Sequence, residues 1–240
     1  MNLNKITSLE TRTFSGLTRL TYLGVYQNEI SFIEADSFRD LRSLKDLIVH
    51  SNKLETVKSQ VFRNMKSVQT LDLAWNRVIT VERGSFANMS SLALLNMSHN
   101  NLDCDGIDES LLNLSALARL DLSFNFIDQL KINCLRGLSR LKELYMSSNT
   151  LKSIEAGAFS HIINLRILFL DNNFIMALDA NAFASLNNLQ LLNLAYNKLS
   201  SLGNLSGNLL ILERLENLDI SDNKLETVEQ FDFNFRYFMN

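Results

Sequence analysis

Apolar residues recur along the chain in a pattern that repeats about every 24 residues and is marked each time by an asparagine. We count positions back from this asparagine and call each repeat a coil. Positions −8, −5 and −3 hold Leu, Val, Ile or Met in every coil, as Leu165, Leu168 and Leu170 do before Asn173. The residues at −5 and −3 alternate with more polar neighbours, which is the period of a short β-strand with one buried face. We therefore expect one strand per coil, stacked into a parallel sheet.

The repeated asparagine falls where each predicted strand must turn. Its side-chain amide can donate and accept hydrogen bonds at once, so it can satisfy backbone groups that the turn leaves unpaired inside the coil. Exposed turn asparagines would not explain why one residue type holds this register throughout. We therefore predict a buried structural ladder that comprises Asn28, Asn52, Asn76, Asn100, Asn125, Asn149, Asn173, Asn197 and Asn223.

Further apolar columns lie at −11 and −14, and phenylalanine predominates in the second of them. The −14 column holds Phe14, Phe38, Phe62, Phe86, Leu111, Leu135, Phe159, Phe183 and Leu209. These columns predict one continuous core with a stacked aromatic spine. Insertions in a solenoid bulge outward as loops, so we expect loops in the two longer coils, which end at Asn125 and Asn223.

The register Phe-x-x-Leu-x-x-Leu-x-x-Leu-x-Val-x-x-Asn-x-Ile-x-x-Ile at residues 14–33 resembles the typical 24-residue class of leucine-rich repeats. The resemblance implies an α/β solenoid, a horseshoe with one parallel β-sheet on its concave face and short helical or irregular segments on its convex face. Such repeats are widespread in animal extracellular proteins, including Toll-type receptor ectodomains and chaoptin-like adhesion proteins. By that resemblance the chain is expected outside the cell or at its surface, as a recognition module in innate immunity or cell adhesion.

Composition fits one ordered domain over residues 1–240 with about ten repeats, because 46% of residues are apolar and neither proline nor a glycine-rich linker interrupts the pattern. Extracellular relatives usually end in cysteine-rich caps, and neither end of this chain has a cysteine cluster. We therefore expect a fragment of a longer array that lacks both caps, or a chain whose caps lie outside this sequence. A solenoid without polar caps exposes its core, so self-association is expected through Phe231, Phe233, Phe235 and Phe238.

Charge and motifs narrow the functional classes. The formal net charge is −3, with 23 basic and 26 acidic residues spread along the chain and no basic block, so nucleic acid is not expected as a partner. No apolar run approaches the roughly 20 residues of a membrane span, and the first residues lack the apolar stretch of a signal peptide. No metal-ligand spacing, cofactor motif or catalytic constellation occurs. We expect no enzyme, no metal and no cofactor.

Residues at −6, −4 and −2 point away from the core, on the free face of the predicted sheet. Two apolar clusters emerge there as candidate ligand-binding sites. The first comprises Tyr22, Tyr26, Ile48 and His50, with Trp75 at the strand's edge, and the second comprises Tyr145, Ile167, Phe169 and Leu191. Adjoining exposed aromatics mark interaction surfaces, although ordinary cross-strand packing is the alternative interpretation.

Two kinds of modification are candidates. Four Asn-x-Ser/Thr sequons, at Asn88, Asn96, Asn113 and Asn204, can carry glycans if the chain passes through the secretory pathway. Cys104 and Cys134 lie on successive coils and form either a disulfide, which requires Cα atoms about 4.4–6.8 Å apart, or two free thiols.

The leading hypothesis is a recognition or adhesion module of an extracellular or cell-surface receptor, which holds a protein ligand, with or without glycans, on its concave sheet. The alternative is a structural scaffold, outside or inside the cell, that acts through assembly with other chains. A signal peptide and a cysteine cap upstream would favour the first.

Overall fold

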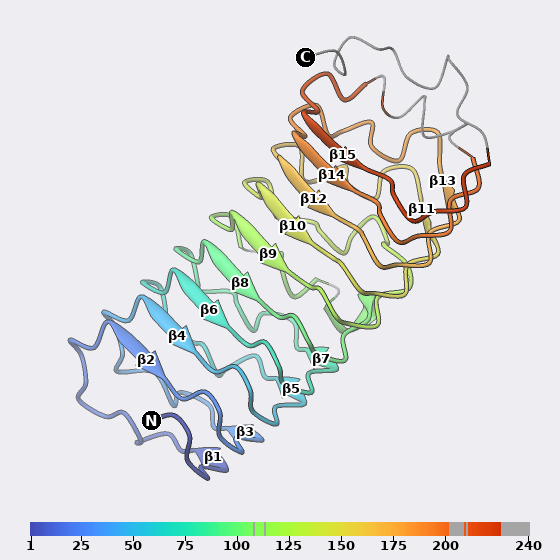
Figure 1. Ribbon diagram of the computed structural model, residues 1–240. Coiled ribbons are helices and arrows are strands. Elements are labelled where there is room, and N and C mark those ends of the chain that lie inside the picture. Colours follow the sequence, from blue (N-terminus) through green and yellow to red (C-terminus); the bar gives the residue numbers. More distant parts are fainter. Residues whose placement is uncertain (108, 113, 202–208, 210, 227–240) are drawn as a thin grey trace.

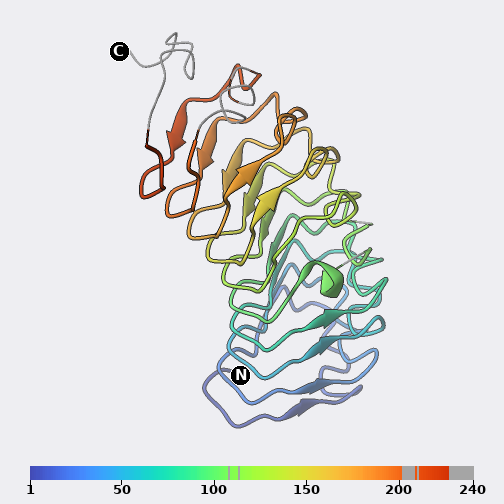
Figure 2. The same ribbon diagram turned by 90° about the vertical axis from the view of Figure 1, so that its right-hand side faces the viewer.

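The protein is a curved solenoid, described by a computed structural model for residues 1–107, 109–112, 114–201, 209 and 211–226. Each coil adds one step along the long axis, and equivalent segments of successive coils lie side by side (Figure 1). The axis bends along its length, as the view turned by 90° shows (Figure 2).

In the described part of the chain, one strand from each of nine coils enters a single parallel sheet. In spatial order these strands are β15 (Asn217–Asp219), β14 (Leu191–Asn193), β12 (Ile167–Phe169), β10 (Glu143–Tyr145), β9 (Arg119–Asp121), β8 (Leu94–Asn96), β6 (Thr70–Asp72), β4 (Asp46–Ile48) and β2 (Tyr22–Gly24). Each spans positions −6 to −4, and its middle residue is the apolar −5 side chain that faces the core. The strands pair without slippage, as Leu47 and Leu71 do between β4 and β6. The structure confirms the predicted solenoid and its parallel sheet.

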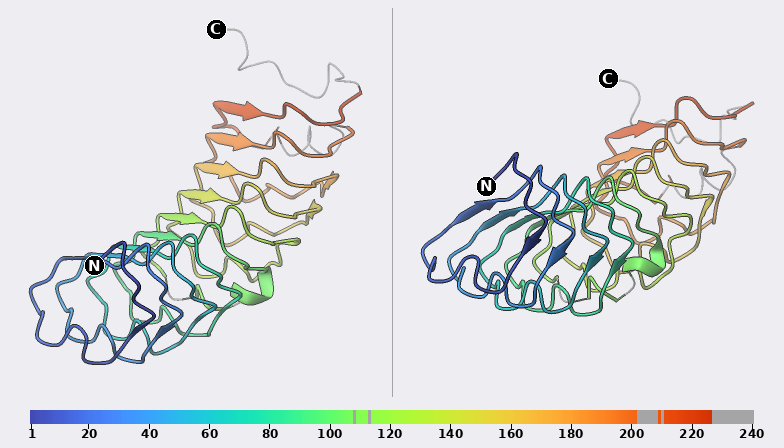
Figure 3. Two further views of the ribbon diagram at one scale, coloured as in Figure 1. Left: turned by 60° about the horizontal axis from the view of Figure 1, so that its bottom comes forward. Right: turned by 90° about the horizontal axis from the view of Figure 1, so that it is seen from below.

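Shorter strands form on the opposite side of the coils. Among the residues that the structure describes, three two-stranded parallel sheets pair β1 (Ser8–Leu9) with β3 (Phe32–Ile33), β5 (Thr56–Val57) with β7 (Thr80–Val81), and β11 (Ser153–Ile154) with β13 (Ala177–Leu178). The helix α1 (Cys104–Ile107) takes the place of such a strand beside β7, within the first of the two longer coils (Figure 3).

The core between the two sides follows the predicted columns. Phe14, Phe38, Phe62 and Phe86 stack in series with ring centroids 5.8, 6.0 and 6.0 Å apart, and Phe159 stacks on Phe183 at 5.8 Å. Leu111 and Leu135 fill the two places between these runs and are buried. The aromatic spine is therefore present in two segments, joined by leucine.

The asparagines make the same four hydrogen bonds in all nine coils. The side chain of Asn125 donates to the carbonyls of Leu122 (3.1 Å) and Ser123 (3.3 Å) in its own coil and to that of Met97 (3.0 Å) in the preceding coil. The side-chain oxygen of Asn125 accepts a hydrogen bond from the backbone N–H of Leu102 at 2.9 Å. Each asparagine thus joins two coils from inside the turn, and all of them are buried except Asn223, which is partly buried.

The last described coil packs less completely than the inner ones. Leu215, Leu218, Ile220 and Leu225 are only partly buried, whereas the equivalent leucines of the inner coils are fully buried. The aromatics at 231, 233, 235 and 238, for which we expect self-association, lie outside the described residues.

Candidate binding surfaces

The second predicted cluster forms a continuous patch on the free face of the sheet. Ile167 pairs with Leu191 between β12 and β14, and Tyr145 pairs with Phe169 between β10 and β12. The rings of Tyr145 and Phe169 stack with centroids 5.2 Å apart. All four side chains are half-buried, so each still presents surface to solvent. We call these four residues the concave patch.

Charged side chains lie along one edge of the concave patch and contact Tyr145. The guanidinium of Arg119 lies 4.5 Å from the Tyr145 ring centroid and 3.6 Å from the Glu143 carboxylate. The Tyr145 hydroxyl donates to Glu143 at 3.1 Å. Burial raises the pKa of the Tyr145 phenol above its ordinary value, against the opposing effect of Arg119. The phenol therefore stays protonated at neutral pH, and its orientation is fixed before any ligand arrives.

The first predicted cluster is only partly assembled. Tyr26 stacks on His50 with ring centroids 4.6 Å apart. Ile48 lies beside Gly24 in the sheet, and the missing side chain of Gly24 makes room for two tyrosines. A Cβ at Gly24 would lie 3.0 Å from the Tyr22 hydroxyl and 3.1 Å from the Tyr26 ring.

Trp75 does not stack on that cluster. Its ring stacks on His99 at 3.6 Å, and His99 stacks on Phe124 at 4.0 Å, so three successive coils contribute to a second aromatic row. Trp75 and Phe124 remain 59% and 49% exposed. We call these three residues the flank stack.

The flank stack arises from the −1 position of the coil. Each residue there, immediately before the asparagine, is left-handed, with φ between 52° and 56° in all nine coils from Gln27 to Asp222. This backbone conformation turns successive −1 side chains the same way, so rings in adjacent coils become parallel. The sequence-based columns stopped at −2 and therefore missed His99 and Phe124. Extending them by one position would have found both.

Several carboxylates on the sheet accept hydrogen bonds from the backbone. At position −4 the side chains of Asp72, Asp121 and Asp219 each accept a hydrogen bond from the backbone N–H two residues later. Burial raises the pKa of Asp72, whereas the hydrogen bonds from Ser221 lower that of Asp219. These groups act as turn acceptors, and within the described residues no three metal-binding side chains gather into a metal site.

The sequons differ in their surroundings. Asn88 is exposed, and Asn113 and Asn204 lie outside the described residues. Asn96 is half-buried, and its side-chain oxygen accepts from both the N–H and the hydroxyl of Ser98, at 3.1 and 2.9 Å. The two cysteines form a disulfide, with Cα atoms 6.2 Å apart.

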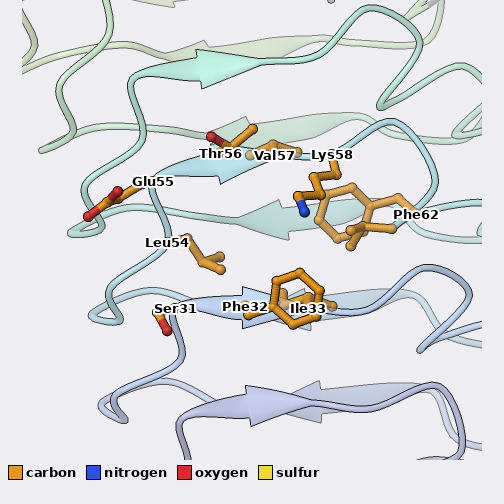
Figure 4. Close-up of a pocket in the computed structure, with 10 residues that line it drawn as sticks. Ser31, Phe32, Ile33, Leu54, Glu55, Thr56, Val57, Lys58 and Phe62 are labelled. Carbon is orange, nitrogen blue, oxygen red and sulfur yellow. The ribbon is translucent and has the colours of Figure 1, made fainter.

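A small hollow of about 200 Å³ lies on the opposite side of the coils. Ile33, Val57 and Phe62 contribute apolar walls, and the Lys58 ammonium lies 4.7 Å from the Phe32 ring centroid (Figure 4). The hollow lies where β3 and β5, each paired on its other side, do not pair with each other. Its walls combine apolar side chains with Ser31, Glu55, Thr56 and Lys58, which do not form an arranged set of reacting groups.

The fold and these surfaces define a repeat solenoid that presents exposed aromatic rows. Four segments of the chain, residues 2–54, 42–102, 115–175 and 163–225, match the model of the family described as leucine rich repeat. The chain belongs to the leucine-rich-repeat family. A comparison with curated proteins gives no match. In the part of the chain that the structure describes, no helix is long and apolar enough to span a membrane.

Solved structures share the fold over nearly the whole chain. The TLR13–ssRNA13 complex has a TM-score of 0.86 and 26% identity, over 94% of this chain and 32% of that chain. The leucine-rich repeat domain of APL1B has a TM-score of 0.77 and 23% identity, over 94% of this chain and 64% of that chain. The FLRT2 leucine-rich repeats, in an octameric complex with Latrophilin 3 and Unc5D, give 0.81 and 23%, over 96% and 71%. This chain thus spans about a third of the first structure's length.

Proposed function

We propose that this chain is a protein-recognition module of an extracellular or cell-surface receptor, that it holds a protein ligand on the concave patch, and that it catalyses no reaction. The observation that carries the proposal is the stacked pair Tyr145 and Phe169, continued by Ile167 and Leu191 across three strands. Aromatic anchors within a shielded apolar patch carry most of the binding energy in protein interfaces.

Of the similar solved structures, the FLRT2 repeats support this interpretation, because they take part in a protein assembly. The TLR13 structure instead contains single-stranded RNA. RNA is the less suitable ligand for the concave patch of this chain, because the carboxylates of Asp121, Glu143 and Asp171 lie at or near the same face. Repulsion between these carboxylates and phosphates opposes RNA binding.

Two variants test the site. The chain, secreted from animal cells as a tagged fusion, is screened against an array of purified ectodomains, and binding of any partner is then measured with Phe169→Ala and Tyr22→Ala. Truncating a buried aromatic anchor costs about 2 kcal/mol or more, which is roughly thirtyfold in affinity. We expect that loss for Phe169→Ala, with little change in melting temperature, and no loss for Tyr22→Ala. Normal binding by Phe169→Ala would assign the patch to sheet packing.

A further inference from the structure

A second hollow, of about 350 Å³, lies on the flank of the solenoid where the strands of the main sheet begin. Its residues occupy positions −9 and −7 of successive coils. Ala116 and Ala118 hold these positions in one coil, and Arg140 and Lys142 hold them in the next. Arg166 follows at −7 of the third coil. Two small side chains beside three long cationic ones produce the recess.

The hollow is positive and lacks an acidic partner. Within the described residues, none of Arg140, Lys142 and Arg166 has a carboxylate within ion-pair distance, and no carboxylate lines the hollow. The neighbouring Glu143 is held by Arg119 and by the hydroxyl of Tyr145. Strands in adjacent coils are about 4.8 Å apart, so the three cations gather on one small area of the surface. A bound anion would balance their charge.

Two asparagines give the hollow a fixed wall. The side-chain amide of Asn164 donates to the carbonyl of Ser139 at 2.8 Å, and that of Asn188 donates to the carbonyl of Ile163 at 3.1 Å. The oxygen of Asn188 also accepts from Arg214 at 2.8 Å. The wall is therefore held between coils, and one more cation lies beside it.

We propose that this hollow binds sulfate groups of a sulfated polysaccharide. Guanidinium groups match oxyanions in paired hydrogen bonds, and the lysine adds a point charge. Three cations distributed over adjacent coils suit several anionic groups on one polymer better than a single small anion. No aromatic side chain lines the hollow, so bases of a single-stranded nucleic acid would have no ring to stack on.

The hollow lies beside the sheet rather than on its free face, so a polysaccharide there leaves the concave patch open to a protein ligand. Binding itself does not depend on the proposed protein-recognition function. For the hollow to bind such a polysaccharide in an organism, the chain must have the extracellular location proposed above, because sulfated polysaccharides occur outside the cell.

The test is calorimetry with a heparin octasaccharide in 0.15 M salt. The triple variant Arg140→Gln, Lys142→Gln, Arg166→Gln removes the cations of the hollow. The control triple variant Lys58→Gln, Arg77→Gln, Lys152→Gln removes the same number of exposed positive charges elsewhere. We expect a loss of affinity of about tenfold or more for the first, since three exposed charge pairs are removed, and about twofold or less for the control.

Three outcomes would overturn the proposal: an equal loss in both triple variants, equal binding of fully desulfated heparin, or tighter binding of poly(U) RNA that is lost in the hollow variant. Ala116→Glu tests the same site without removing any cation, because it places a carboxylate on the floor of the hollow. If the first triple variant fails to fold, undiminished binding by folded Ala116→Glu would refute the site.

Discussion

Replacement of Asn125 by alanine tests whether the asparagine ladder stabilises the solenoid. Three carbonyls lose a donor, but each keeps another: Met97 retains Asn100, Leu122 retains Asn149, and Ser123 retains the backbone N–H of His99. These carbonyls remain satisfied, so their contribution to the loss is small.

The buried N–H of Leu102 decides the magnitude, because the side-chain oxygen of Asn125 is its hydrogen-bond acceptor. Leu102 is fully buried, so water cannot replace that acceptor. An unsatisfied buried donor costs about 1–3 kcal/mol. We therefore expect Asn125→Ala to lower the free energy of unfolding by about that amount.

The neighbouring Asn101 is the matched control. It is exposed and makes one hydrogen bond, at 3.3 Å, to the carbonyl of Arg77. Asn101→Ala removes the same atoms and should cost about 0.5 kcal/mol or less, as exposed substitutions usually do. Urea denaturation followed by circular dichroism compares the midpoints of the two variants. Equal midpoints would show that the ladder bonds add nothing beyond what solvent supplies.

Three further predictions concern other features. Gly137→Ala should destabilise the fold by about 2–4 kcal/mol in thermal unfolding, and Gly16→Ala by about 1 kcal/mol. Both glycines have a positive φ, but only a Cβ at residue 137 would meet a backbone oxygen, at 2.2 Å. Equal costs for the two substitutions would contradict this reasoning. Cys134→Ser opens a disulfide between residues 30 apart and should cost up to about 3–4 kcal/mol, and an unchanged denaturation midpoint would argue against the bond. Trp75→Ala should raise the pKa of His99 toward 6.5 in an NMR titration, because burial lowers that pKa and the tryptophan supplies part of it; a constant pKa would refute the shielding.

The lowered pKa of His99 fixes the direction of its effect on stability. The unfolded chain binds a proton more readily than the folded chain, so folding favours the neutral ring. The stability that this ring contributes is present above pH 6.5 and is lost as the pH falls through the lowered pKa.

The sheet and the core could be predicted because the same side-chain types return at the same positions. Leu47 and Leu71 pair in the structure because each fills the −5 position of the buried face. The recurrence of an apolar residue at this position is also what reveals the strands in the sequence. The same register places the concave patch on adjacent strands, but it does not determine how the Tyr145 and Phe169 rings stack, because that depends on side-chain conformation.

Features that depend on distances between coils could not be predicted in this way. The sequence left the state of Cys104 and Cys134 open, because adjacent coils do not determine a Cα separation. The basic hollow arises from a difference between coils, since Ala118 stands where the next coil has Lys142. A repeat pattern reveals the residues that recur in every coil, whereas the basic hollow depends on residues that differ from one coil to the next.

The left-handed backbone conformation of the residue before each asparagine affects how related chains can diverge in sequence. A left-handed conformation costs a residue other than glycine about 1–2 kcal/mol, yet tryptophan, histidine, phenylalanine and tyrosine all adopt it here. The backbone and the adjacent ladder therefore impose this direction whatever the side chain is. Substitutions in the column change what a partner meets along this edge while they leave the buried columns untouched. Related chains can thus acquire different partners here without a new fold.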